Sequence, residues 1–164
     1  MTVLHLGCGR QPLPEWVPDR DEVRLDLDPE ASPDVVASIT DVGPIGPFSI
    51  VYSSHVLEHV YPHETLQALR ESQRVLGDGG YAVHIVPDLE GIQATDAVVY
   101  ESPAGPVTGL DMIYGMKSMV AKQPYMAHKN GFTKDSLEAA LREAGFSKVL
   151  VKRASFSLIG VGVK

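Results

Sequence analysis

The sequence predicts an α/β fold, a three-layer sandwich whose mainly parallel sheet is covered on both faces and carries an antiparallel strand near its C-terminal end. The first observation is that strand-like apolar runs alternate with helices or crossovers up to residue 86, as in parallel sheets. The second is that residues 149–154 and 157–163 are both strand-like and only a turn apart, as in antiparallel neighbours. With 164 residues, 44% of them hydrophobic, the chain is expected to form one domain over residues 1–164.

Short apolar runs that stop at glycine, proline or a polar turn mark the strands of the first half. They are expected at residues 2–6, 23–27, 35–39, 48–54 and 81–86. The fourth run reads FSIVYSS, and its β-branched and aromatic residues suit a central strand. Three prolines follow the first strand so closely that the first crossover is expected to be irregular; they are Pro12, Pro14 and Pro18.

Two helices are indicated by their end residues and by apolar residues on one face. The first has Pro62 in its first turn and is expected to end at Gly77, after which residues 78–80 turn the chain into the next strand. The second follows the cap residue Thr133 and ends at Gly145.

Between these helices, residues 90–127 form a segment with a weaker pattern. Residues 101–105 are expected to be a loop, and residues 110–119 an amphipathic helix. The Met and Tyr residues between Met112 and Tyr125 suit either a core or the lining of an acceptor pocket.

Charge and cysteine content narrow the function classes. The net charge of -7 offers no basic footprint for nucleic acid or for an anionic membrane, so neither partner is expected. Cys8 is the only cysteine, and the seven residues before it contain no Lys or Arg, so LHLGCG is not expected to be a lipoprotein signal. No run approaches the roughly 18 apolar residues of a membrane helix. We therefore expect a soluble cytoplasmic protein.

The glycine turn after the first strand is the first candidate site. Gly7 and Gly9 let the backbone approach a ligand, and a nest of N–H groups there favours an anionic group. Asp26, seventeen positions after Gly9, falls at the end of the second strand, where a carboxylate can accept hydrogen bonds from a ribose. Asp28 competes for that role, but Asp28-Pro29 is also ordinary turn chemistry, so Asp26 is favoured.

Six motifs in this order resemble those of the class I S-adenosylmethionine-dependent methyltransferases, of the small type 11 kind. They are LHLGCG, VRLDLDP, PDVVASITD, FSIVYSSHVLEHV, ESQRVLGDGGYAVHIVPDL and HKNGFTKDSLEAALREAGF. The likeness covers residues 3–89 and 128–150 and implies a Rossmann-like three-layer sandwich. It also implies S-adenosylmethionine as the cofactor.

The resemblance assigns cofactor contacts to particular residues. Those implied to hold the methionine part through their backbone are Gly7, Cys8 and Gly9. Those implied to hold the adenosine are Asp26 at the ribose, Leu27 against the adenine, Asp41 at the adenine amino group and Val42 beside it. Those implied to lie near the methyl-bearing sulfur are Ser54 and His55. The pair Glu58-His59 resembles the family's Leu-Glu-His signature and is interpreted as mainly structural.

Neither a catalytic residue nor a metal ligand is predicted. The cofactor carries an activated leaving group, so a base is needed only when the acceptor loses a proton. His84 lies within a strand and is expected to be a buried, hydrogen-bonded residue. No histidine pair has the HExxH spacing, and none has a cysteine neighbour typical of zinc sites, so no metal is expected.

The leading hypothesis is methyl transfer from S-adenosylmethionine to an unidentified small molecule, with residues 90–127 as a variable insertion on the acceptor side. The alternative is a noncatalytic protein that keeps the fold and binds a ligand or partner. It is motivated by His5, Gln11 and Ser49, where the family usually has an acidic residue, a glycine and an aspartate. A nicotinamide-dependent enzyme is disfavoured, because the GxGxxG spacing would require glycine at Pro12.

Overall fold

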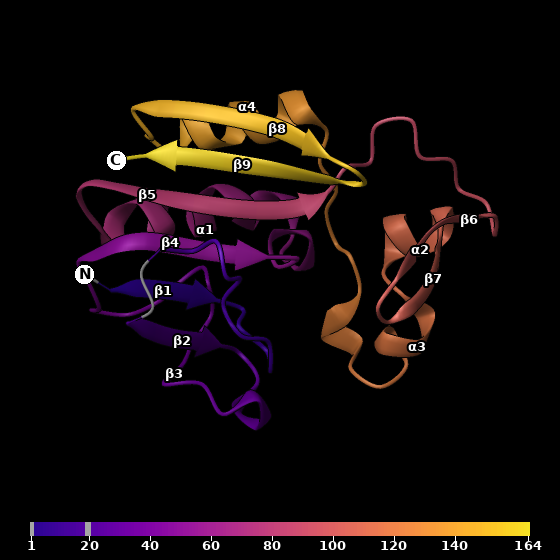
Figure 1. Ribbon diagram of the computed structural model, residues 1–164, viewed down its shortest axis with the longest axis horizontal. Coiled ribbons are helices and arrows are strands. Elements are labelled where there is room, and N and C mark those ends of the chain that lie inside the picture. Colours follow the sequence, from indigo (N-terminus) through magenta and orange to yellow (C-terminus); the bar gives the residue numbers. More distant parts are fainter. Residues whose placement is uncertain (1, 19–20) are drawn as a thin grey trace.

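A seven-stranded sheet in the order β3-β2-β1-β4-β5-β9-β8 organises the computed structural model, which describes residues 2–18 and 21–164 (Figure 1). Its strands are β1 (Val3–Leu6), β2 (Glu22–Asp26), β3 (Val35–Val36), β4 (Phe48–Ser54), β5 (Leu76–Pro87), β8 (Lys148–Ala154) and β9 (Ser157–Val163). The pairs among β1 to β5 are parallel, and β9 is antiparallel to both of its neighbours. The predicted α/β class, with its antiparallel strand near the C-terminus, is confirmed.

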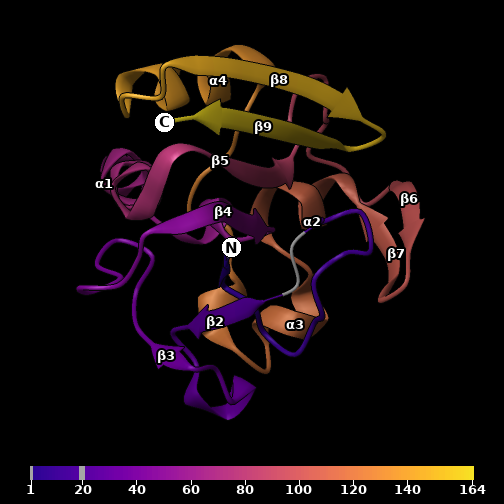
Figure 2. The ribbon, with the colours of Figure 1, turned by 60° about the vertical axis from the view of Figure 1, so that its left-hand side comes forward.

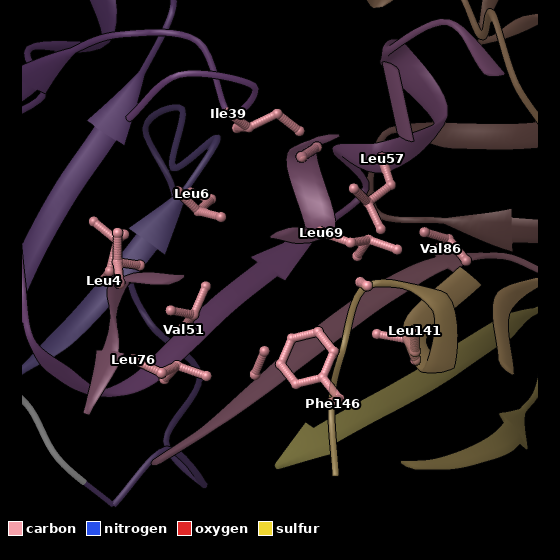
Figure 3. Close-up of a cluster of buried hydrophobic side chains, with 14 of the residues drawn as sticks. Leu4, Leu6, Ile39, Val51, Leu57, Leu69, Leu76, Val86, Leu141 and Phe146 are labelled. Carbon is pink, nitrogen blue, oxygen red and sulfur yellow. The ribbon is translucent and has the colours of Figure 1, made fainter. Parts of the chain in front are cut away.

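Two helices, α1 (Pro62–Val75) and α4 (Lys134–Glu143), cover one face of this sheet (Figure 1). Between them and the strands lies the main core, which includes Leu4, Val51, Leu69, Leu141 and Phe146 (Figure 3). Both helices begin as predicted: Pro62 stands in the first turn of α1, and the Thr133 hydroxyl accepts from the Ser136 amide at 3.3 Å.

The opposite face is covered by irregular chain from the first crossover. Leu13 and Val17, both buried, pack there against strand residues that include Val3, Ile50 and Tyr52. The described part of this crossover, residues 7–18, contains no regular helix, as its prolines predicted.

The predicted boundaries differ most from the structure at the third strand and where the first long helix meets β5. The third strand covers Val35–Val36 and not residues 35–39, because the chain turns at an isolated bridge between Ser38 and Asp41. The first long helix ends at Val75, and β5 begins at once with Leu76, so residues 78–80 lie within a strand. The pairing of β5 with β4 shifts register in this stretch, which accommodates the glycines.

The insertion between β5 and α4 has more regular structure than predicted. It contains β6 (Val98–Ser102), β7 (Gly105–Thr108), α2 (Gly109–Tyr114), α3 (Lys117–Val120) and the 3-10 turn η3 (Pro124–Met126). The loop expected at residues 101–105 is confined to the turn at residues 103–104, because Glu101, Ser102 and Gly105 are paired in the β6–β7 hairpin. The single helix expected at residues 110–119 is broken at Gly115, whose φ of 90° no helix contains. Figure 1 and Figure 2 place this group beyond the carboxyl ends of the parallel strands.

His84 is a buried titratable residue in the middle of β5. Its side chain is fully buried, and Nδ1 lies 2.7 Å from the Ser53 hydroxyl. Nε2 has no hydrogen-bond partner among the described residues. The prediction of a buried, hydrogen-bonded histidine is therefore confirmed for only one of the two ring nitrogens. Burial lowers the pKa of His84 from 6.5 to about 4.

This shift predicts acid destabilisation that depends on His84. Because the folded pKa lies below the unfolded value, the unfolded chain takes up the proton first, so stability is full above pH 6.5 and falls toward pH 4. At pH 5 the loss from this residue amounts to about 2 kcal/mol. Urea denaturation of the wild type and of His84→Gln at pH 7.5, 6 and 5 measures it. The variant should lack this component of the pH dependence, whereas parallel pH curves for the two proteins would contradict the assignment.

Candidate functional site

A cavity of about 710 Å³ opens at the carboxyl ends of β1, β2 and β4. This is where open parallel sheets bind ligands, next to the point at which the strand order reverses. Of the predicted cofactor residues, those that line the cavity are Gly7, Cys8, Gly9, Asp26, Leu27, Ser54 and His55. Chain beyond β3 and residues of the insertion, among them Met119 and Tyr125, complete the wall.

The turn after β1 depends on glycine at two positions. Gly7 has a φ of +58° and Gly9 a φ of +49°, which side-chain-bearing residues adopt at a cost. At Gly7 a Cβ would come within 2.4 Å of a Val56 methyl group, whereas at Gly9 nothing lies within 4 Å. Gly7 is therefore needed for packing, and Gly9 leaves open space toward the cavity.

Two amides of this turn donate to other groups of the protein in this structure. The Cys8 N–H donates to the Leu25 carbonyl at 3.2 Å, and the Gly9 N–H donates to Asp26 Oδ2 at 2.7 Å. Both donors are therefore used within the protein. The cationic side chain at this end of the cavity is that of Arg10, which bonds a backbone carbonyl at 3.3 Å through one of its donors.

Asp26 ends β2 and holds the chain on both sides of it. Its Oδ2 accepts from Gly9, and its Oδ1 accepts from the Asp28 amide at 2.9 Å. Each carboxylate oxygen can accept two hydrogen bonds, so both retain a free lone pair in the cavity. The predicted position of Asp26 at the strand end is confirmed by the strand bounds.

A hydrogen-bond network of three side chains, Arg24, Glu22 and His5, holds the backbone of the glycine turn. Arg24 donates to the carbonyls of Gly9 at 2.9 Å and Gln11 at 3.1 Å, and to Glu22 at 3.0 Å. His5, which is buried, donates from Nδ1 to the same Glu22 oxygen at 2.7 Å. Burial lowers the pKa of His5. This network occupies the place where the sequence departs from the family pattern.

Asp28 connects β2 to the insertion across the cavity. Its Oδ1 caps the short helix η1 (Pro29–Ala31) through the Glu30 amide, so the turn interpretation is correct. Its Oδ2 accepts from the Tyr125 hydroxyl at 2.7 Å and from the Gln123 amide group at 3.5 Å. The bond to Asp28 raises the pKa of Tyr125 to about 12. The insertion therefore reaches over the cavity and is tied to its far side.

Two of the predicted residues, Asp41 and Val42, do not line the cavity. Asp41 is exposed, and its carboxylate accepts from the Gly43 amide at 3.3 Å. The Val42 side chain is buried in the core, and its N–H donates to Glu71 at 3.0 Å. The early turn after β3 explains this, because it directs the chain away from the cavity; the residues that line it there are Ala37, Ser38 and Ile39.

A second cavity of about 230 Å³ adjoins the first and shares His55, His59, Met119 and Met126 with it. The rest of its wall combines apolar residues, polar residues and histidine; it includes Glu58, Tyr100, Asp111, Met112, Met116 and His128. His55 follows β4 with a φ of +56°, and its Nδ1 lies 3.1 Å from Glu58 Oε1. This bond raises the pKa of His55, while burial lowers the pKa of His128.

The strand order and the glycine turn at its reversal define a Rossmann-like fold with a cavity at its strand ends. The chain belongs to a family defined by its methyltransferase domain, whose model matches residues 1–151. The resemblance found in the sequence is thereby confirmed. No curated protein matches the chain. In the described residues, none of the helices combines the length and apolar character needed to cross a membrane.

Solved methyltransferases share this fold at low sequence identity. A methyltransferase from Mesorhizobium loti has 17% identity and a TM-score of 0.69, over 99% of this chain and 90% of that one. One from Archaeoglobus fulgidus has 15% identity and a TM-score of 0.67, over 99% and 86%. The 1,6-didemethyltoxoflavin-N1-methyltransferase of Burkholderia thailandensis, with 1,6-didemethyltoxoflavin and S-adenosylhomocysteine bound, has 17% identity and a TM-score of 0.63, over 99% and 70%.

Several contacts of the site were not predicted from the sequence. Arg24 supports the turn although it stands inside β2, and Tyr125 reaches the cavity from an insertion that matched no motif. His128 stands far along the chain from Glu58 and His59, and only the fold brings the three together. The signal that could have indicated this role of Arg24 is its charge, because a cationic side chain is unusual inside the otherwise apolar and acidic strand motif VRLDLDP.

Proposed function

We propose that this protein transfers the methyl group of S-adenosylmethionine to a small-molecule acceptor. The observation that supports it best is that the glycine turn and Asp26 share one cavity with the end of β4, and that a second cavity adjoins this end. Membership of a methyltransferase family supports the reaction type. The B. thailandensis relative holds S-adenosylhomocysteine on the same fold, which supports the choice of cofactor.

The residues of the first cavity fit this cofactor. Asp26 retains lone pairs for the ribose hydroxyls, and Leu27, whose side chain is 63% exposed, offers an apolar surface for the adenine. Gly9 leaves room for the methionine part, and Arg10 supplies a positive charge for its carboxylate. We assign the adenine edge to the chain after β3 and not to Asp41 or Val42.

The bound cofactor supplies an activated methyl group on a sulfonium, so the protein's task is alignment and exclusion of water. Ser54 and His55 border the junction of the two cavities, where we place the transfer. The hydrogen bond between Tyr125 and Asp28 holds the insertion against the far side of the first cavity and limits access of water to it. We therefore assign residues 90–127 as the acceptor-side insertion of a single domain.

The second cavity favours a small, largely apolar acceptor. Its volume of about 230 Å³ is below the range of drug-sized ligand sites. Methionine side chains on its wall adapt to irregular apolar shapes. The net charge of -7 argues against a nucleic acid as the acceptor.

Calorimetric and thermal-shift titrations with S-adenosylmethionine, S-adenosylhomocysteine and NAD test the proposal. Both adenosyl compounds should bind one per chain, and at about 100 times the dissociation constant they should stabilise the fold by roughly 2.7 kcal/mol. NAD serves as the control and should not bind. Folded protein that responds to neither adenosyl compound would overturn the proposed function. Binding without methyl transfer to any acceptor in a panel would favour the noncatalytic alternative.

A further inference from the structure

Three metal-ligating side chains converge at the junction of the two cavities. Glu58 and His59 belong to the short helix η2 (Leu57–His59), and His128 precedes α4 in the sequence. Each offers one ligand atom, and these atoms all lie within 4.8 Å of one another. All three residues line the second cavity.

Backbone carbonyls determine which nitrogen of each imidazole is free. His59 Nδ1 lies 3.2 Å from the Ala127 carbonyl oxygen, and His128 Nδ1 lies 2.9 Å from that of Met112. A carbonyl oxygen can only accept, so Nδ1 carries the proton in both rings. In the neutral imidazoles the lone pair is therefore on Nε2, and this is the arrangement of metal-binding histidines, whose other N–H is held by an outer partner.

Glu58 adds a buried carboxylate, one oxygen of which accepts no hydrogen bond from the described residues. Its side chain is 1% exposed, Oε1 lies beside His55, and Oε2 has no hydrogen-bond partner among residues 2–18 and 21–164. A buried carboxylate is costly unless a cation or several donors compensate it. His55 compensates Oε1 alone, and the Lys129 ammonium lies over the Tyr61 ring, 4.9 Å from the ring centroid, so neither group bonds Oε2.

Two backbone hydrogen bonds hold the main chain of Glu58 in place. Its carbonyl accepts from the amides of Lys129 at 2.8 Å and Asn130 at 3.1 Å. These bonds link η2 to the segment that carries His128, so the ligands from the two segments are held together before any ion arrives. Such preorganisation lowers the cost of assembling a site.

We propose that Glu58, His59 and His128 bind one divalent transition-metal ion of the zinc or iron(II) type at the junction of the two cavities. Two imidazole nitrogens and one carboxylate suit these ions and leave coordination positions open. An open position in the second cavity takes an oxygen ligand from the acceptor, and the ion lowers the pKa of a hydroxyl bound to it. This last step, unlike the metal site itself, rests on the proposed function.

Metal titration of the chelator-treated protein tests the site directly. Calorimetry should show one Zn²⁺ per chain, and Co²⁺ should give a visible absorption band typical of nitrogen and oxygen ligands. Glu58→Gln and His128→Gln should each weaken Zn²⁺ binding by at least about 100-fold, the upper end of what loss of an outer-shell partner costs. His63→Ala is the matched control: His63 is an exposed histidine stacked on Tyr61, outside both cavities, and its removal should change nothing.

Folding and cofactor binding are measured separately. Glu58→Gln keeps the shape of the side chain, so melting temperatures of the metal-free variant and of the metal-free wild type separate the loss of a metal ligand from the loss of the fold. Absence of Zn²⁺ binding, binding that the two variants leave unchanged, or equally tight binding of Mg²⁺ would each overturn the site. If S-adenosylhomocysteine binds and Zn²⁺ does not, the metal site is overturned and the proposed function is not. If Zn²⁺ binds and S-adenosylhomocysteine does not, the metal site is supported and the result counts against the proposed function.

Discussion

Gly7→Ala should lower the free energy of unfolding by about 2 to 5 kcal/mol, because two penalties fall on one position. A left-handed φ costs a residue with a Cβ about 1 to 2 kcal/mol, and overpacking typically adds about 1 to 3 kcal/mol. The Cβ at Gly7 would lie 2.4 Å from Val56 Cγ2 and 2.8 Å from Cγ1, so Val56 or the turn must move. Urea denaturation of the two proteins at the same pH measures the loss.

Gly9→Ala is the matched control for this prediction. Gly9 shares the left-handed φ but has open space around its Cβ position, so only the first penalty applies, about 1 to 2 kcal/mol. Val56→Ala removes the methyl groups that the new Cβ meets, so combining it with Gly7→Ala should cost less than the sum of the two single changes. Equal losses for Gly7→Ala and Gly9→Ala, with additive behaviour of the pair, would contradict the packing argument.

The regular parts of the fold could be predicted because their signals are local. β4 has the bounds that its β-branched and aromatic run indicated, and α4 starts at its predicted cap. The β6–β7 hairpin was missed because Pro103 and Pro106 look like loop residues, although a proline is tolerated in a two-stranded sheet that has only edges. The break at Gly115 was missed because an apolar stripe does not reveal a positive φ.

The candidate site was predictable where its residues follow a strand directly. Gly7, Asp26 and Ser54 each stand at the carboxyl end of a parallel strand, so the topology alone brings them to one cavity. The family resemblance implied Asp41 for the same edge, but the short β3 and the turn after it remove this residue from the edge. His128 reaches Glu58 through the path of the whole insertion, which no local pattern encodes.

Two of the three departures from the family pattern that motivated the noncatalytic alternative belong to one hydrogen-bond network under the glycine turn. His5 and Gln11 stand where an acidic residue and a glycine are usual, and both connect to Arg24, directly or through Glu22. Arg24 holds the Gly9 carbonyl while Asp26 holds the Gly9 amide, so the turn is fixed from both sides. A different set of side chains thus produces a defined glycine turn, and these substitutions alone give no reason to expect that binding is lost.

Asp26→Asn should weaken binding of S-adenosylhomocysteine by about 10-fold to 150-fold, since hydrogen bonds to a charged group contribute about 1.5 to 3 kcal/mol. The amide replaces one acceptor oxygen with a donor, which opposes the N–H of Gly9 or of Asp28 and removes acceptor capacity from the ribose. Asp41→Asn is the matched control and should leave the affinity unchanged, because Asp41 lies outside the cavity. Calorimetric titration of both variants provides the measurement.

Asp26 can act on the cofactor in two ways, and the ligand separates them. If the carboxylate accepts from the ribose, a 2′,3′-dideoxy analogue of S-adenosylhomocysteine should bind the wild type and Asp26→Asn with similar affinity, because the interaction is absent from both complexes. If Asp26 acts through the position of Gly9, the variant should lose affinity for both ligands by the same factor. Equal loss would therefore make Asp26 a positioning residue, because the hydrogen bond from the Gly9 amide does not depend on the ribose.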